Sequence, residues 1–413
     1  MTEWKKYKLG EIGSFFGGVT SISKEDYGHG TPFLPYKNVY KNSKVNVYEL
    51  ELMNVKQQDL LKRSAKYGDI FFTASSETPD EVAMSSVLLD EVENLTFNGF
   101  CKRFRLNNFN MLLPEYARYL FRDILFRREI YQLATGDIRF NISQESLANI
   151  EIEIPNNETQ TQIAQILTSF DDKIELLGQM NQTLETMAQA IFKEWFIDFN
   201  FPGFDGELVD GLPKGWRKVE LRELISVKDG THDSPKQQES GKYLITSKHL
   251  KNHFIDFDTA YKISEEDFEK INKRSKVDKL DILITMIGTV GNFYFVHDDV
   301  IDFAIKNIGL FKTSENPDLS YFIYFVLSSE ETSEYFIKRL AGSTQQYLTL
   351  ETLRQTPIVL PDTPILNAFN HTAKLLYEKI ALNTYQIRTL THLRDTLLPK
   401  LMSGAVAMKN KTL

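Results

Sequence analysis

Apolar residues recur every seven positions along residues 158–198, and this spacing predicts one long helix. Two such tracks run four residues apart, which is the a/d pattern of a helix that pairs with another helix in a coiled coil. The first track is Ile163, Phe170, Leu177, Leu184 and Ile191, and the second is Leu167, Ile174, Asn181, Ala188 and Trp195.

The same stripe returns 206 residues further along the chain and predicts a second long helix. Its tracks are Phe369, Leu376, Asn383, Leu390 and Leu397, and then Ala373, Ile380, Ile387, Arg394 and Leu401. Because Pro364 and the poorly matched residues 362–372 interrupt the likeness, we expect this helix to begin later and its seam to be shorter.

Each seam contains one asparagine, Asn181 or Asn383, and the two lie on different tracks. Antiparallel packing about the midpoint brings them opposite each other, and a buried Asn pair fixes register. Residues 155–200 have 2 basic and 7 acidic side chains, and 362–413 have 7 and 3, so charge favours the same pairing. We predict an intramolecular antiparallel coiled coil about 50 Å long, with helix-pairing residues Leu177, Asn181, Leu184, Ile380, Asn383 and Ile387. The alternative is two separate amphipathic helices, each packed on its own domain.

The remainder of the chain repeats too. Residues 4–9 correspond to 216–221, and 68–73 correspond to 280–285, a shift of 212; from Gly136 and Gly342 onward the shift is 206. The second copy is therefore six residues shorter between Thr73 and Gly136. A period near 200 residues indicates a duplicated domain and not a solenoid.

Both copies mix strand and helix patterns. β-rich runs predict strands at 45–48, 69–73, 150–154, 281–284 and 293–296, and a leading proline predicts a helix in each copy, at 114–134 and 317–340. The predicted fold class is α+β, with two similar domains of mixed β-sheet and helices. The predicted boundaries are 1–155 for the first domain, 156–199 for its helix, 200–215 for a linker, 216–361 for the second domain, 362–404 for its helix and 405–413 for a tail.

Composition limits the class of protein. The 413 residues include 42% hydrophobic and 12% aromatic side chains, which favours a folded chain. Cys101 is the single cysteine, so no intramolecular disulfide forms, and Met1 leads into charged residues without a signal region. No apolar run reaches the ~18 residues that cross a bilayer. We expect a cytoplasmic protein without a membrane partner.

Sequence motifs for catalysis are missing. The chain has no phosphate-binding loop, no His-Glu-x-x-His, no Cys-x-x-Cys and no dinucleotide fingerprint. His249 and His253 lack a third ligand nearby and fit a surface pair better than a metal site. Pro79-Asp80-Glu81 resembles the start of a nuclease carboxylate motif, but no Glu-x-Lys follows. We predict no catalytic residue, no metal and no cofactor in this chain.

Binding chemistry is present, in equivalent places of both copies. Arg and Lys grip phosphates or read guanine, and Asn and Gln read adenine. Each cluster alone is more typical of a solvated surface, but the recurrence favours DNA contact. The candidates in the first copy are Lys37, Asn38, Lys41, Lys44, Lys102, Arg103, Arg105, Arg139 and Asn141, with Tyr36 and Tyr40 beside them; those in the second are His232, Lys236, Lys248, His249, Lys251, Gln345, Gln346 and Tyr347.

The loop before each seam helix is the most suggestive of these clusters. Residues 134–142 match 341–348: a small-residue turn, then long polar side chains, then an apolar anchor. This composition suits a loop that presents side chains into a groove, and it equally suits an ordinary helix-to-strand connection.

In its two-copy plan the chain resembles the DNA-specificity subunit of type I restriction-modification enzymes, over nearly its whole length. The resemblance is carried by the start Trp4 to Ile12, the turn Thr135-Gly136 before Asn141-Ile142, Pro155, the helix segments 162–167, 181–185 and 190–196, the linker 211–216 and the ending 397–404.

The resemblance implies two target-recognition domains, each reading one half of a split, asymmetric sequence in double-stranded DNA. The two helices would act as a ruler and dock the modification subunits. It also implies that methylation comes from two modification subunits with S-adenosylmethionine, and that restriction subunits use ATP and Mg for translocation and cleavage. Weak identity between the copies at 19–65 and 231–276 fits two different half-sites.

Two other classes stay open from the residues alone. A coiled-coil scaffold that binds only proteins would show no DNA dependence in any complex. A nuclease or methyltransferase with fused recognition domains would act without other subunits, and the missing cofactor motifs argue against it.

Overall fold

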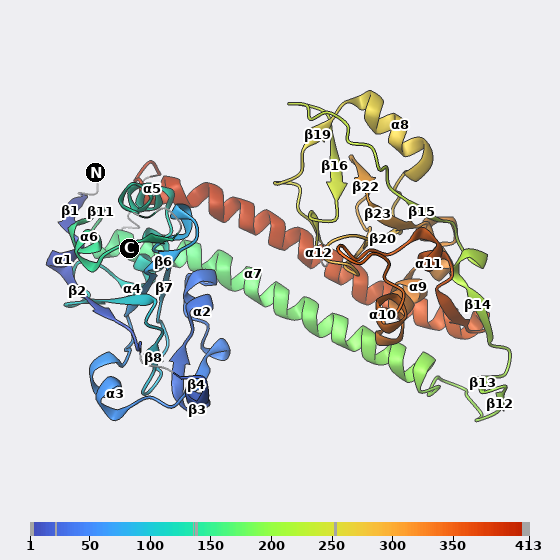
Figure 1. Cartoon of the computed structure of the whole chain (residues 1–413), viewed down its shortest axis with the longest axis horizontal. Coiled ribbons are helices and arrows are strands. Elements are labelled where there is room, and N and C mark those ends of the chain that lie inside the picture. The colour runs from blue at the N-terminus through green and yellow to red at the C-terminus, as the bar shows by residue number, and fades with distance from the viewer. Residues whose placement is uncertain (1–3, 21–22, 135, 137–138, 252–253, 407–413) are drawn as a thin grey trace, which may run out of the picture. The chain divides into compact units, whose positions relative to one another are not determined.

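The computed structural model describes residues 4–20, 23–134, 136, 139–251 and 254–406, so His253, Thr135 and tail residues 407–413 lie outside the described part. The chain divides into two compact units (Figure 1). The first unit is Met1–Ile174 with Thr389–Leu413, and the second unit is Glu175–Arg388. Each unit therefore combines one copy of the repeat with parts of both long helices.

The sheets of the first unit are small and mostly antiparallel. Their strand orders are β2-β9-β5-β7, β4-β3-β8, β1-β11 and β10-β6. The bounds are β1 Lys5–Lys8, β2 Gly13–Gly17, β3 Tyr27–Leu34, β4 Glu51–Met53, β5 Ile70–Thr73, β6 Ser75–Ser76, β7 Ser85–Val87, β8 Thr96–Phe97, β9 Cys101–Leu106, β10 Phe140–Asn141 and β11 Glu151–Ile154. The helices are α1 Leu9–Ile12, α2 Tyr36–Lys41, α3 Gln57–Arg63, α4 Pro114–Leu120, α5 Ile124–Leu133 and α6 Gln144–Asn149.

The second unit repeats this topology, in the orders β15-β23-β20-β21, β19-β16-β22 and β14-β24. The bounds are β14 Arg217–Glu220, β15 Val227–Asp229, β16 Lys242–Thr246, β17 Leu250–Lys251, β18 Phe254–Ile255, β19 Lys262–Ile263, β20 Ile282–Thr285, β21 Phe293–Phe295, β22 Phe303–Lys306, β23 Ile308–Phe311 and β24 Pro357–Leu360. The helices are α8 Glu265–Ser275, α9 Ser320–Leu327, α10 Glu330–Ile337 and α11 Leu350–Arg354, and β12 Leu208–Val209 pairs with β13 Leu212–Pro213 in the linker.

Strand register locates the six-residue difference between the copies. Thr73 pairs with Cys101 in the first copy, and Thr285 pairs with Ile308 in the second. The shift is thus 212 on the first strand and 207 on its partner. Five residues are lost between Thr73 and Cys101, and the sixth is lost before Gly136. The duplicated domain is confirmed strand by strand.

The two long helices are α7, Asn157–Phe192, and α12, Thr363–Met402. A π-helical turn, Lys193–Ile197, extends α7. None of the seam residues on either helix is exposed. The expectation that the second helix begins late is wrong: Pro364 sits in its first turn, where a missing backbone N–H costs nothing.

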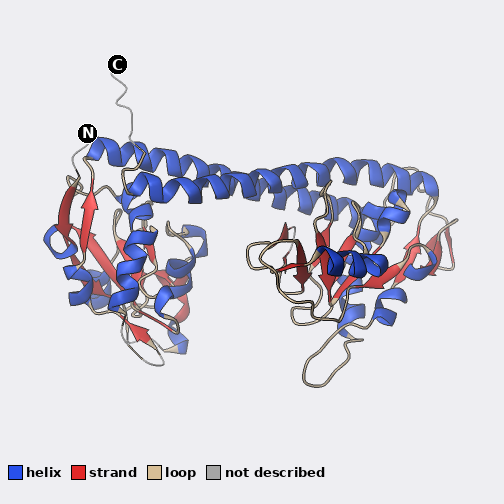
Figure 2. Cartoon of the chain, turned by 90° about the horizontal axis from the view of Figure 1, so that it is seen from above, coloured by secondary structure: helices blue, strands red, loops and turns tan. Residues whose placement is uncertain are grey.

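Within each unit the helices pair antiparallel, side by side (Figure 2). In the second unit, Asn383 Nδ2 donates to Asn181 Oδ1 at 2.8 Å, and Asn181 Nδ2 donates to Thr384 Oγ1 at 3.2 Å. In the first unit, Arg394 donates to Asp171 Oδ1 at 2.8 Å. Asn181 on α7 contacts Asn383 on α12, whereas the earlier residue Asp171 contacts the later residue Arg394. The two helices of this chain therefore run antiparallel in an intramolecular coiled coil.

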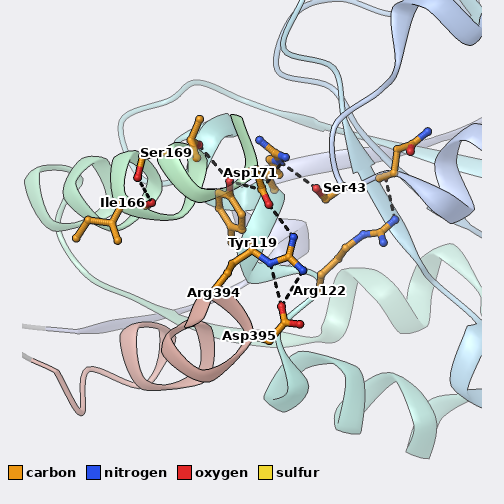
Figure 3. Close-up of polar contacts among 11 residues, drawn as sticks. Ser43, Tyr119, Arg122, Ile166, Ser169, Asp171, Arg394 and Asp395 are labelled. Atoms are coloured by element: carbon orange, nitrogen blue, oxygen red, sulfur yellow. Dashed lines mark hydrogen bonds and ion pairs between the residues drawn. The ribbon is translucent and has the colours of Figure 1, made fainter. Parts of the chain in front are cut away.

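Asp171 also fastens the helical pair of the first unit to its globular part (Figure 3). Tyr119 Oη donates to Asp171 Oδ2 at 2.8 Å, and an Arg118 nitrogen lies 2.7 Å from the same oxygen. Both side chains come from α4. One largely buried carboxylate on α7 therefore joins α4 and, through Arg394, α12.

In the second unit an aromatic cluster makes the equivalent attachment. The Phe196 ring lies 4.9 Å from that of Phe369 on α12, 5.0 Å from that of Phe322 on α9 and 5.7 Å from that of Trp216. All four rings are buried. Aromatic contacts of this size anchor a helix strongly.

Three predicted elements differ from the structure. Residues 45–48 do not form a strand. The Asn46 side chain accepts a hydrogen bond from Tyr48 N and so caps a 3-10 turn at Val47–Glu49. The single helix predicted at 114–134 divides into α4 and α5, since Asp123 caps a new start. The one predicted at 317–340 divides into α9 and α10 at the cap Ser329. No helix among the described residues is long and apolar enough to span a membrane.

Replacing Asn181 with Leu leaves the fully buried Asn383 without its hydrogen-bond partner, so we expect the free energy of unfolding to fall by about 1–3 kcal/mol. Replacing both asparagines with Leu removes the stranded polar group and should recover most of that loss. Urea unfolding measures both, with the exposed Gln179→Leu as control. A double variant no more stable than Asn181→Leu would contradict the pairing.

Candidate nucleic-acid interface

The basic run on β9 stabilises the fold of the first copy. Arg103 is 2% exposed, donates to Ser64 O at 2.5 Å and lies over the Phe16 ring, and burial lowers its pKa to about 10. Arg105 holds both Asp69 oxygens, at 2.7 and 2.6 Å. Of these two predicted DNA-contact residues, Arg103 is therefore buried, and the Arg105 guanidinium is bound to Asp69.

The second copy has the same ion pair with a different cation. Asp281 is the repeat equivalent of Asp69, and Lys312 is that of Arg105; Lys312 Nζ lies 2.5 Å from Asp281 Oδ2. In both copies the carboxylate also accepts a backbone N–H three residues earlier, at 2.8 Å from Lys66 and 2.7 Å from Asp278. This pair is part of the duplicated framework.

Asn38 and His249 are also interior residues. Asn38 is 2% exposed, and its side chain donates to Asn46 O at 2.9 Å and accepts from Asn46 N at 3.1 Å. His249 is fully buried, its pKa is lowered by burial, and its Nδ1 accepts from Thr246 N at 3.0 Å. Both predicted DNA-contact side chains are therefore interior in this structure.

The other basic candidates remain at the surface to different degrees. In the first copy, Lys37 and Lys41 on α2 are exposed, Lys102 is half-buried, and Lys44 lies 3.2 Å from Asp90. In the second copy, His232 bonds to Asp229 and Asn307. Exposed lysines there are Lys236, Lys248 and Lys251.

The loop before each seam helix contains a glycine at positive φ in both copies. Gly136 and Gly342 have φ of 141° and 88°. A Cβ on Gly136 would lie 2.1 Å from Arg139 O, and one on Gly342 would lie 2.3 Å from Gln345 O. Only glycine allows these turns. The exposed side chains that follow are Arg139 and Asn141, and in the second copy Gln345, Gln346 and Tyr347.

Each loop is tied to the end of a central strand. Ile142 N donates to Ala74 O just after β5, and Leu348 N donates to Met286 O just after β20. In the first copy this segment leads from α5 to the short strand β10, and in the second it leads from α10 to α11.

A cavity of about 410 Å³ adjoins this loop in the first copy. From the sequence, Arg139 is a candidate and the tyrosines of α2 lie beside basic residues. Glu81 appears there only as part of a nuclease-like motif, and Phe100, which is 59% exposed, is not among the candidates, because only the fold brings these separate turns together. The lining residues are Tyr36, Tyr40, Ser75, Ser76, Glu77, Glu81, Phe100 and Arg139.

No metal centre is apparent among the described residues, where no three His, Cys, Asp or Glu side chains gather closely enough to hold an ion. Glu81, the carboxylate of the nuclease-like motif, accepts instead from Tyr40 Oη at 2.7 Å and Ser76 Oγ at 2.8 Å.

Two copies of one α+β domain, an antiparallel helical pair and polar loops in equivalent places define a two-site recognition protein. The chain belongs to the type I restriction-modification DNA specificity family, whose domain matches residues 1–186 and 213–388. It is a non-catalytic specificity subunit with two target-recognition domains.

Relatives match over the whole chain. The MjaIX specificity subunit of Methanocaldococcus jannaschii is 26% identical over 98% of this chain and 94% of its own. The HindI specificity subunit of Haemophilus influenzae is 24% identical over 98% of this chain and 100% of its own. The crystal structure of a type I S subunit from M. genitalium shares the fold, with a TM-score of 0.61, 17% identity and coverage of 97% and 96%.

Lys312 is 5% exposed, and its ammonium group is paired with the Asp281 carboxylate. Replacing Asp281 with Asn removes the negative charge that balances this buried positive charge. We expect the free energy of unfolding to fall by about 3 kcal/mol, since a broken buried pair strands a charge. Asp69→Asn should act in the same direction in the first copy.

The control is Glu334→Gln, which breaks the exposed pair with Lys338 at 2.7 Å and should change stability far less than Asp281→Asn does, because water screens an exposed pair. Urea unfolding measures all three variants. Equal losses for Asp281→Asn and Glu334→Gln would show that the shared ion pair is not a framework element.

Proposed function

We propose that each recognition domain reads one half of a bipartite, asymmetric target in double-stranded DNA. The domains are residues 1–155 and 216–361, and the observation that carries the proposal is that equivalent glycines are followed by different exposed side chains. Arg139 in the first copy is replaced by Gln345 in the second, each three residues after a glycine that leaves no room for a Cβ. Arg suits guanine or phosphate, and Gln suits adenine.

The spacer helices, residues 156–199 and 362–404, set the distance between the half-sites. α7 and α12 have 36 and 40 residues, which is about 54 and 60 Å of helix at 1.5 Å per residue. One turn of DNA advances about 34–36 Å. Helices of this length support two readers one turn apart, with unread base pairs between them.

The chain requires partners for tight binding. Its net charge is −8, whereas affinity for DNA comes largely from neutralising phosphates. We infer that two modification subunits dock on the helices, supply phosphate contacts and use S-adenosylmethionine. Restriction subunits in the full complex hold ATP and Mg, this chain holds no cofactor, and the complex acts in the cytoplasm.

Selection from random duplexes tests this function. The chain co-purified with its modification subunits is bound to a random library, and the retained DNA is sequenced. We expect one bipartite motif with a fixed gap. We also expect the chain alone to retain little DNA at physiological salt, because it is acidic. Retention of DNA without any shared motif would refute the proposal.

Exchange of residues 1–154 for those of another specificity subunit tests the division of labour. The new complex should keep one half of the original motif and the original gap, and replace the other half. Sequencing of retained duplexes measures both halves in one experiment. A motif changed in both halves would mean that the copies do not read independently.

A further inference from the structure

The cavity beside the loop of the first copy is lined by aromatic side chains around a fixed carboxylate. The rings of Tyr36 and Tyr40, both from α2, lie 6.3 Å apart and only 12° from parallel. Phe100 lies on the turn before β9 and is 59% exposed. Arg139, at the same cavity, is exposed.

Hydrogen bonds hold the polar side of the cavity rigid. Tyr36 Oη donates to Ser75 O at 2.8 Å, which joins α2 to the strand β6 that pairs with β10 of the loop. Tyr40 Oη and Ser76 Oγ donate to opposite oxygens of Glu81. The cavity is therefore formed before any ligand arrives, and its side chains lose little freedom on binding.

Glu81 has acceptor capacity left. A carboxylate offers about four lone-pair sites, and hydrogen bonds from the side chains of Tyr40, Ser76 and Thr78 leave one of them. These hydrogen bonds, that from Tyr40 first, lower the pKa of Glu81, so the group is ionised at neutral pH. An ionised carboxylate accepts hydrogen bonds and donates none, which selects for an N–H group on the ligand.

The second copy lacks this chemistry on its equivalent backbone. By the shifts of 212 and 206, Tyr36 corresponds to Lys248 and Arg139 to Gln345. Between them the shift is 208, because β5 pairs with β7 as β20 pairs with β21, and Glu81 therefore corresponds to Thr289. The carboxylate and the tyrosine pair are thus particular to the first copy. The framework ion pair, in contrast, recurs in both. A feature that differs on a duplicated framework is suited to reading one half-site only.

We propose that this cavity binds one unstacked adenine or cytosine of the half-site read by the first domain, with Phe100 stacked on the base and Glu81 accepting from its exocyclic amino group. The proposal rests on the proposed function and deepens it. Adenine and cytosine carry an amino group where guanine O6 and thymine O4 present acceptors. Stacking on an aromatic ring needs a base face, which an intact duplex hides. Arg139 is positioned to contact the neighbouring phosphate.

The test compares Phe100→Ala and Glu81→Gln in the complex with modification subunits. Phe109→Ala is the matched control, because Phe109 is 39% exposed in the same domain and does not line the cavity. We expect wild type and control to select adenine or cytosine at one position of one half-site. Both test variants should lower that preference about tenfold, the value of one base contact, and leave the other half-site unchanged.

2-Aminopurine placed next to that position reports unstacking, because its fluorescence rises when the neighbouring base leaves the stack, and the amino group read by Glu81 is kept. Its fluorescence should rise on binding of wild type and of Phe109→Ala, and rise less with Phe100→Ala. Arg139→Ala should weaken binding to all sequences alike and reduce the salt dependence by about one phosphate contact. Equal thermal unfolding of the variants excludes misfolding as the cause.

Selection of the wild-type motif by both Phe100→Ala and Glu81→Gln overturns the proposal, as does unchanged 2-aminopurine fluorescence. Either result leaves the proposed function intact, since the wild-type motif is recovered. Recovery of no motif by the wild-type complex overturns the proposed function itself, so the two failures are distinguishable.

Discussion

Antiparallel pairing of α7 and α12 is the interaction on which the rest of the structure depends. Each helix has an apolar stripe that is stable in water only when covered. Apolar contacts alone tolerate slippage by a heptad. The bond between Asn181 and Asn383 and the ion pair between Asp171 and Arg394 remove that freedom, because a slipped register would bury the amides and the carboxylate without partners.

Duplication adds a second constraint. Strand order, register, glycine turns and the Asp–cation pair are the same in both copies, although Arg105 of the first is Lys312 of the second. What the copies share is therefore the set of interactions that hold the backbone. Some of what they do not share lies on exposed turns, where a substitution costs little stability and alters the surface offered to a ligand.

Periodicity and repetition predicted the fold well, because both are properties of local spacing. The heptads gave the antiparallel pair and its register, and the shifts gave two equivalent domains. Helix caps were harder to predict. The sequence pattern predicted one continuous helix in each copy, whereas Asp123 and Ser329 each cap the start of a second helix there.

The site was predicted less well, because burial depends on partners distant in sequence. Arg103 and Arg105 look like any basic run until Ser64 and Asp69 come within reach. Glu81 and Phe100 lie 19 residues apart, and only the fold brings them to one cavity. A sequence shows which residues can bind; it does not show which of them the fold has already used.

The use of cations inside the fold bears on how an acidic chain can recognise DNA. Arg103, Arg105, Arg118 and Lys312 hold buried or half-buried polar groups, so they add to the charge count without adding to the charge that DNA meets. The chain as a whole has 56 acidic and 48 basic residues, so it offers phosphates little net attraction. Contacts to phosphates raise affinity for every sequence alike, whereas contacts to bases raise affinity for one. A reader poor in phosphate contacts has weak general affinity, and its base contacts then account for a larger part of the difference between target and bulk DNA. An acidic specificity subunit with a few rigid reading positions is therefore consistent with DNA recognition, provided that partner subunits supply the general affinity.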